Sequence, residues 1–233
     1  MLQIPPARRE CLLFPTRENA TGFDALTQPL LQVQSLGLQR GERRLFRNLN
    51  FSLGQGGLAV VRGANGAGKT SLLRALAGLA QPIEGQAHLF GVAARRLASA
   101  DRQRLLYLGH AEGLKQDLSV RENLIFWAGL DTGRAPRAGE IDPLLEQVDL
   151  TAAGDRLVRH LSAGQRRRTV LARMIHSPAE LWLLDEPLTN LDEAGRTLVR
   201  QRLQAHLQAG GAAVVATHTS LGVDAPGSVE IAL

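Results

Sequence analysis

The chain has 233 residues, of which 44% are hydrophobic and 21% charged, values typical of a soluble globular protein with one core or two joined lobes. Its longest apolar runs, at 181–184 and 210–216, are far shorter than the roughly 18–20 residues of a membrane-spanning helix. The net charge of +5 comes from arginines scattered along the chain and densest at 166–168, which favours a solvated surface over a nucleic-acid-binding face.

The first 29 residues are interpreted as a mobile N-terminal extension, and residues 30–233 as the folded part. Charged residues and a proline interrupt any apolar run of signal-peptide length in this segment. The single cysteine, Cys11, cannot form an intrachain disulfide, which favours a reducing, cytosolic compartment.

Period-two or continuous apolar runs predict strands, and apolar residues at helical spacing predict helices. Strands are expected at 30–36, 43–53, 57–63, 180–187, 211–218 and 228–233. Helices are expected at 71–79, 119–130, 141–150, 163–176 and 193–207. We therefore expect an α/β core into which a mostly helical subdomain, at about 93–165, is inserted.

The segment GANGAGKT fits the pattern G-x-x-x-x-G-K-[ST] and lies between a predicted strand and a predicted helix. Its backbone N–H groups and the helix N-terminus would bind phosphates, Lys69 would reach the β- and γ-phosphates, and the Thr70 hydroxyl would bind Mg²⁺. Lys69 is one of only 2 lysines in the chain, which indicates that a compact charge is needed here. The predicted ATP-binding residues are Gly63, Ala64, Asn65, Gly66, Ala67, Gly68, Lys69, Thr70 and Ser71.

The run LWLLDEP predicts a buried strand that ends in two acidic residues. Asp185 would hold Mg²⁺ and Glu186 would polarise an attacking water molecule. His218 follows another predicted strand and would touch the γ-phosphate from that strand's end. We thus expect Thr70 and Asp185 as metal ligands, and Glu186 and His218 as catalytic residues.

The segment LSAGQRRR opens a predicted helix and exposes a hydroxyl and backbone donors that suit a second phosphate contact. One fold cannot easily place both loops on the same γ-phosphate, so the second loop is expected to act across a dimer interface. The residues concerned are Leu161, Ser162, Ala163, Gly164 and Gln165.

In this order, the motifs resemble those of the nucleotide-binding subunits of ATP-binding cassette (ABC) transporters. Gly63–Thr70 resembles the Walker A motif, LSAGQ the signature, LWLLDE the Walker B motif with its catalytic glutamate, and LTNLD, with Asp192, the D-loop. The resemblance implies a P-loop NTPase (RecA-like) core with an antiparallel β subdomain and an inserted helical subdomain. It also implies a homodimer that forms on ATP binding and encloses two ATP molecules with Mg²⁺.

Three positions depart from the usual family pattern: Ala163 replaces a signature glycine, no aromatic residue lies between Leu31 and Leu45 to stack on adenine, and His110 takes the place of the Q-loop glutamine. The stretch GHAEGLKQDLSVRENL resembles one subfamily, the ATP-binding subunits of the haem exporter of cytochrome c maturation. In that subfamily His110 would act as a metal contact or a coupling residue, and Lys115 would face the docking partner.

That resemblance implies a peripheral subunit on the cytoplasmic side of the bacterial inner membrane, which contacts the membrane only through CcmB-type and CcmC-type integral-membrane partners. It would energise haem export, or the release of a haem-loaded chaperone, without binding nucleic acid. The ATPase of another transporter is an alternative. A soluble ABC ATPase that acts on DNA or ribosomes is a further one, although such proteins generally carry two cassettes or long coiled coils.

Overall fold

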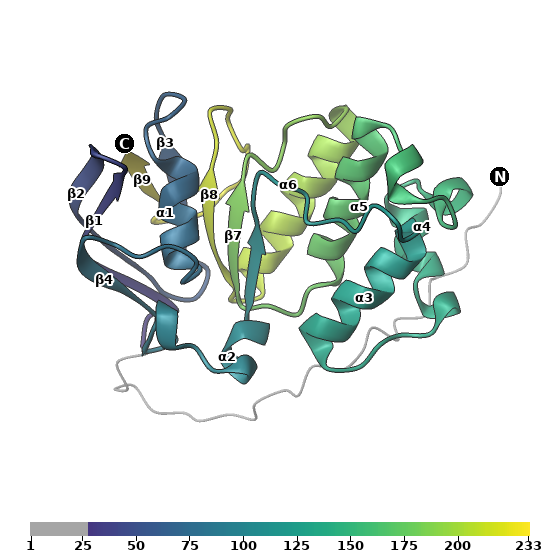
Figure 1. The fold of residues 1–233 in the computed structure, drawn as a ribbon, viewed down its shortest axis with the longest axis horizontal. Helices are drawn as coiled ribbons and strands as arrows, with labels where there is room; N and C mark the ends of the chain where they lie inside the picture. The colour runs from purple at the N-terminus through teal and green to yellow at the C-terminus, as the bar shows by residue number, and fades with distance from the viewer. Residues whose placement is uncertain (1–27) are drawn as a thin grey trace.

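The computed structural model describes residues 28–233, so most of the predicted N-terminal extension lies outside the described residues. A central sheet of parallel strands has the order β6-β7-β8-β3-β9 (Figure 1). Every residue of β7 and β8 is buried, as expected for parallel strands covered on both faces. The strands are β3 (Leu58–Arg62), β6 (Leu105–Leu108), β7 (Leu181–Asp185), β8 (Ala212–Ala216) and β9 (Val229–Ala232).

A second, antiparallel sheet lies beside the first, with the strand order β2-β1-β4-β5 (Figure 1). Its strands are β1 (Leu31–Arg40), β2 (Arg43–Leu53), β4 (Glu84–Leu89) and β5 (Val92–Ala93). The turn between β1 and β2 needs a left-handed residue, which Gly41 supplies with φ 59°. This sheet carries Leu45, whose side chain lies next to Gly68 in the glycine-rich loop between β3 and α1.

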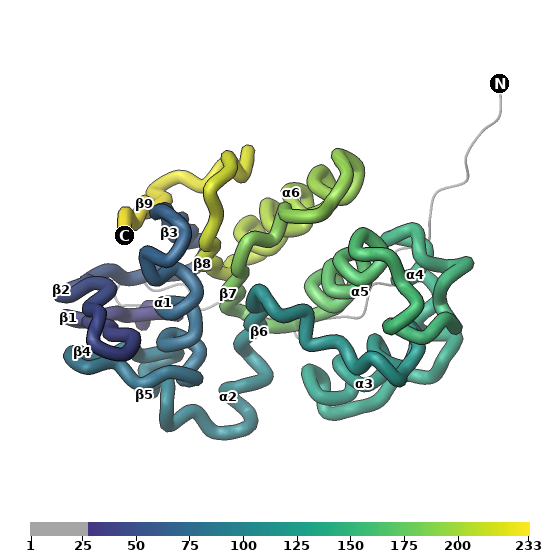
Figure 2. Tube along the Cα trace, turned by 45° about the horizontal axis from the view of Figure 1, so that its top comes forward, coloured from purple at the N-terminus to yellow at the C-terminus, as the bar shows by residue number. Residues whose placement is uncertain are grey.

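The helices are α1 (Lys69–Leu76), α2 (Ser99–Gln103), α3 (Val120–Thr132), α4 (Asp142–Gln147), α5 (Ala163–His176) and α6 (Glu193–Gln208). Helices α3, α4 and α5 gather in a lobe on the side of the parallel sheet away from the antiparallel one (Figure 2). Ser119 and Ser162 begin α3 and α5 with capping boxes, in which a serine hydroxyl and a Glu or Gln side chain satisfy helix-end N–H groups. None of the described helices is long and apolar enough to cross a membrane.

Helix α1 fills the space between the two sheets. Leu72, Leu73 and Leu76 are fully buried on it, in one apolar cluster with residues of both sheets such as Leu89 and Leu183. This packing fixes the position of the α1 N-terminus, where the glycine-rich loop ends.

The structure differs from the sequence prediction within the segment predicted as helical. The segment 105–108 is a strand, β6, which pairs in parallel with β7. Helix α4 covers only 142–147, because the chain leaves the helix at Val148 and turns through a positive φ at Asp149. Strand β4 was also not predicted, since only two of its six residues are buried and apolar alternation is weak. The boundaries 93–165 of the helical subdomain stay a prediction.

Candidate nucleotide site

The loop between β3 and α1 curls around the side chain of Lys69. The Lys69 Nζ donates to the backbone oxygens of Gly63 at 2.7 Å and Ala64 at 3.3 Å. Gly66 and Gly68 adopt φ of 82° and 118°, which side-chain-bearing residues rarely adopt. Gly68 caps α1 without a side-chain hydrogen bond, so the first N–H groups of the helix stay available to an anion.

The first turn of α1 and the end of β7 bring two oxygen ligands together. The Thr70 hydroxyl donates to Asp185 Oδ2 at 2.7 Å, although 115 residues separate them in sequence. Asp185 is 3% exposed. A hydroxyl and a carboxylate are ligands that Mg²⁺ prefers, so this pair fits the ion. The described residues contain no cluster of three or more His, Cys, Asp or Glu side chains that could hold a metal ion.

Glu186 and His218 meet at the ends of β7 and β8. His218 Nδ1 lies 2.9 Å from Glu186 Oε1, and Glu186 is the less exposed partner, with 18% of its side chain exposed against 64%. Glu186 has φ 49°, a left-handed conformation that is costly for a residue with a side chain. Its N–H donates to the carbonyl of Ala216, which anchors the strained residue to β8.

A cavity of about 450 Å³ joins these groups. The sequence-predicted residues that line it are Asn65, Gly66, Gly68, Lys69, Thr70, Ser71, His110, Asp185, Glu186 and His218. Three further residues line it: Arg40 and Leu45, which the sequence did not indicate, and Thr189, which lies in the LTNLD segment but was not predicted as a site residue. Arg40 and Leu45 come from the stretch without an aromatic residue, so a guanidinium and an aliphatic side chain form that wall. Among Gly63, Ala64 and Ala67, none lines the cavity, although the first two bind Lys69.

The signature residues lie apart from this cavity. None of Leu161, Ser162, Ala163, Gly164 and Gln165 lines it, and Ser162 is exposed at the N-cap of α5. The predicted D-loop residue Asp192 caps α6 by accepting from the Gly195 N–H at 2.9 Å and pairs with Arg168. The Gly195 N–H and the Arg168 guanidinium hold the pKa of Asp192 below its usual value.

The loop after β6 carries His110 and Lys115 and is fixed by Asn123 of α3. The Asn123 side chain is fully buried, accepts from the Lys115 N–H at 2.8 Å and donates to the Lys115 and Ser119 carbonyls. The Lys115 ammonium lies 4.5 Å from the centre of the Phe126 ring. His110 is exposed at the cavity mouth, so this one loop reaches from the nucleotide cavity to α3.

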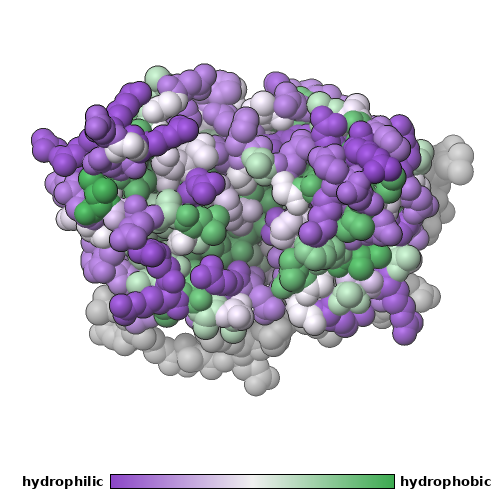
Figure 3. Space-filling view, in the orientation of Figure 1, coloured by the Kyte–Doolittle hydropathy of each residue, from purple (hydrophilic) through white to green (hydrophobic). Residues whose placement is uncertain are grey.

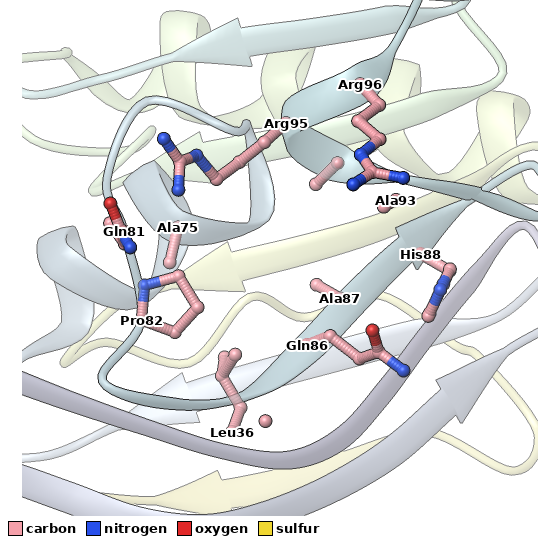
Figure 4. A pocket seen from close by; sticks show the side chains of 12 residues that line it. Leu36, Ala75, Gln81, Pro82, Gln86, Ala87, His88, Ala93, Arg95 and Arg96 are labelled. Atoms are coloured by element: carbon pink, nitrogen blue, oxygen red, sulfur yellow. The ribbon is translucent and has the colours of Figure 1, made fainter.

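Two other hollows contain none of the predicted site residues. A cavity of about 650 Å³ lies between β4, which carries Gln86 and His88, and the turn that carries Arg95 and Arg96 (Figure 4). An apolar groove of about 630 Å³ runs between α1, α2 and α3, and green patches flank it on the face shown in Figure 3. Leu79 and Leu130 line the groove and are half exposed.

The fold and the motifs are similar to those of known proteins. A family model described as ABC transporter matches residues 46–189. An ABC transporter ATP-binding protein from Pyrococcus furiosus superposes with a TM-score of 0.72 at 22% identity, covering 86% of this chain and 96% of that one. A dimeric ATP-binding cassette solved in a post-hydrolysis state with ADP and phosphate superposes with a TM-score of 0.71 at 20% identity, covering 81% and 88%. The fold and the site therefore define an ABC-type ATPase.

Proteins of similar sequence indicate the family within the ABC-type ATPases. The cytochrome c biogenesis ATP-binding export protein CcmA of Xanthomonas oryzae pv. oryzae is 50% identical over 191 residues, which cover 82% of this chain and 87% of that protein. The protein of the same name in Methylococcus capsulatus is 45% identical over 193 residues, covering 83% and 93%. The chain belongs to this CcmA family of ABC transporter ATP-binding proteins.

Proposed function

We propose that the chain is the ATP-hydrolysing subunit of a transporter complex that serves c-type cytochrome biogenesis, through haem export or release of a haem-loaded chaperone. The observation that carries the proposal is the convergence of Lys69, Thr70, Asp185, Glu186 and His218 on one cavity in a chain that is 50% identical to a cytochrome c biogenesis export protein. The complex would lie at the cytoplasmic face of the bacterial inner membrane.

At the phosphate end of the site, the backbone of Gly63–Gly68 and Lys69 would bind the phosphates of ATP. To do so, Lys69 would exchange its carbonyl partners for phosphate oxygens. Thr70 and Asp185 would hold Mg²⁺, which supplies charge neutralisation to the transferred phosphoryl group. The hydrogen bond of 2.7 Å between these two side chains supports this role, because it brings both oxygens to one place.

At the hydrolytic end, Glu186 would orient the attacking water and accept its proton. His218 would hold the Glu186 carboxylate and reach the γ-phosphate, a role supported by the distance of 2.9 Å between the two side chains. His110 lines the same cavity and would contact the metal-bound phosphates or the water there. With these residues in place, a single chain would contact the γ-phosphate from one side only.

The other side would come from a second copy. Ser162, Gly164 and the α5 N-terminus lie outside the chain's own cavity, which supports a head-to-tail homodimer in which each signature completes the other site. Asp192 of the D-loop would lie close to the same interface.

The groove between α1, α2 and α3 would receive the integral-membrane partners of CcmB and CcmC type. Its lining is mainly apolar, with Leu105, Trp127 and Leu130, while Arg102 and Asp131 supply charge at the edge. Lys115, on the loop that also carries His110, would bind an acidic or phosphate-bearing group of the partner and so couple docking to the nucleotide site.

A genetic experiment tests the proposal. The gene is deleted in its host and complemented with wild type, Lys69→Ala or Lys115→Glu, and covalently haem-loaded c-type cytochromes are measured. We expect loss in the deletion and in Lys69→Ala, and loss in Lys115→Glu although the purified variant still binds ATP. Normal cytochromes in the deletion would contradict the role in cytochrome biogenesis and leave an ABC ATPase of another transporter.

A further inference from the structure

The arginine run 166–168 of α5 was predicted as part of a solvated surface, but its side chains are bound. Arg166 Nε lies 3.3 Å from Glu112 Oε2, in the loop that carries His110. Arg168 Nη2 lies 2.6 Å from Asp192 Oδ2, in the D-loop. Two of the three arginines thus connect the signature helix to separate functional segments.

Arg167, between them, reaches the hydrolytic residue. It is only 9% exposed, and its Nη2 donates a short hydrogen bond to the backbone oxygen of Glu186. No carboxylate of the described residues forms an ion pair with it within 4 Å, although the charges of Glu112, Asp185 and Glu186 act on it from further away. The sequence prediction of a solvated side chain is therefore wrong for Arg167.

Burying this guanidinium is unfavourable on its own. Burial lowers the pKa of Arg167, and the three nearby carboxylates oppose that shift. A single hydrogen bond to a neutral carbonyl does not replace the hydration of a cation. A buried, incompletely paired charge is costly to folding, so the contact with Glu186 is better explained by what it does for that residue.

Glu186 needs such a contact, because its backbone is strained. A residue with a side chain at φ 49° costs on the order of 1 kcal/mol and persists only where its surroundings hold it. On one side, the Glu186 N–H donates to Ala216 at 2.8 Å; on the other, its carbonyl accepts from Arg167 and from the Thr189 N–H at 3.2 Å. The carboxylate lines the nucleotide cavity as a result.

We propose that Arg167 is a positioning residue: it holds the Glu186 carbonyl so that the carboxylate stays aligned in the nucleotide cavity, and it makes this alignment depend on the position of the signature helix. The inference rests on the proposed role of Glu186 in hydrolysis. Ser162 begins the same helix, so nucleotide bound by the signature of one copy would act on the Glu186 of that same copy through Arg167.

The test uses the assembled transporter with Arg167→Met and Arg167→Lys, and measures kcat, KM and ATP affinity. Because a misaligned base weakens the chemical step but not binding, we expect kcat of Arg167→Met to fall about tenfold or more while KM and ATP affinity stay within about twofold. Arg202→Met, which removes an arginine bound to Gln147 away from the cavity, is the matched control and should keep the wild-type kcat. Wild-type kcat in Arg167→Met would overturn the inference.

A double-mutant cycle shows whether Arg167 acts through Glu186. In a Glu186→Gln background, single-turnover hydrolysis should change by less than about twofold when Arg167→Met is added, since the group being aligned is gone. Equal factors in both backgrounds would overturn the inference. If Glu186→Gln alone kept the wild-type rate, the proposed role of Glu186 would fail instead. If Arg167→Met does not fold, the same measurements are made with Arg167→Lys. Its ammonium keeps the positive charge but lacks the planar set of N–H donors of a guanidinium.

Discussion

Lys69 shows how a single side chain can organise a glycine-rich loop. Lys69 is 8% exposed and its ammonium group is bonded to the Gly63 and Ala64 carbonyls, so the loop is organised around this charge. A glycine-rich sequence pattern predicted this loop because its conformation depends on neighbouring residues. The role of Arg167 could not be predicted, because it depends on how α5 packs against the end of β7.

Lys69→Ala should lower ATP affinity by about tenfold or more, since a charge-assisted hydrogen bond contributes roughly 1.5–3 kcal/mol. Equilibrium binding of a fluorescent ATP analogue to the purified chain measures this. Lys115→Ala removes the other lysine, which lies on Phe126 outside the cavity, and should bind as wild type. Equal affinity for wild type and Lys69→Ala would contradict the placement of the phosphates.

His206 provides a pH-dependent stability prediction. Its ring stacks on Trp182 with centroids 3.9 Å apart, its Nε2 lies 3.1 Å from the Ala212 oxygen, and burial lowers its pKa. The unfolded chain then binds more protons than the folded one below about pH 6.5, so stability falls as the pH drops through that value toward the folded pKa. His206→Phe keeps the stacked ring without a titrating group. The loss of unfolding free energy between pH 7.5 and 5.5 should be smaller in this variant, and an equal loss in both proteins would contradict the assignment.

Among the elements, α3 and its preceding loop form a unit that the sequence describes only in part. A helix was expected from residue 119, and the structure begins α3 there with a capping box of Ser119 and Glu122. The next residue, Asn123, fixes the Lys115 loop through hydrogen bonds that span up to 8 positions, which no periodicity shows. Strand β6 was missed for a related reason: a four-residue apolar run does not distinguish a strand from a helix, and its pairing with β7 decides.

Asn123→Leu should lower the free energy of unfolding by about 1–3 kcal/mol, because it leaves the part-buried Lys115 N–H without its side-chain partner and removes the bonds that the buried amide donates to the Lys115 and Ser119 carbonyls. Urea denaturation followed by fluorescence measures the change. Asn50→Leu removes comparable side-chain bonds to Ser35 and Asn48 at an exposed position and should cost less than about 1 kcal/mol. If both variants lost the same unfolding free energy, burial of the Asn123 hydrogen bonds would not add to stability.

For the whole molecule, the main feature is that the cavity and the signature segment lie apart in one chain. The cavity lies at the ends of the parallel strands, whereas the signature opens α5 in the helical lobe and does not line that cavity (Figure 1). The sequence alone predicted the α/β class and the order of the core elements. It also predicted the residues of two motifs, the glycine-rich GANGAGKT and the acidic LWLLDEP. The separation of signature and cavity is a property of the tertiary arrangement.

Ser162→Arg should prevent ATP-dependent dimerisation while ATP binding to the single chain stays within about twofold, because a bulky cation at the α5 N-terminus opposes the helix dipole and blocks the phosphate. Size-exclusion chromatography with light scattering, in the presence of a non-hydrolysable ATP analogue, reports the dimer. Gln201→Arg adds the same side chain on an exposed part of α6 and should still dimerise. Dimers of Ser162→Arg would contradict a signature that acts across the interface.

The most direct test of the account is the ATPase rate of the assembled complex with Glu186→Gln. Loss of a general base costs roughly 10²–10⁴-fold, so we expect the rate to fall by at least about a hundredfold while ATP binding and dimer formation persist. The side chain keeps its size and its place beside His218, so a structural effect should be small. Hydrolysis at the wild-type rate would contradict the assignment of Glu186, and with it the hydrolytic site derived from the ends of β7 and β8.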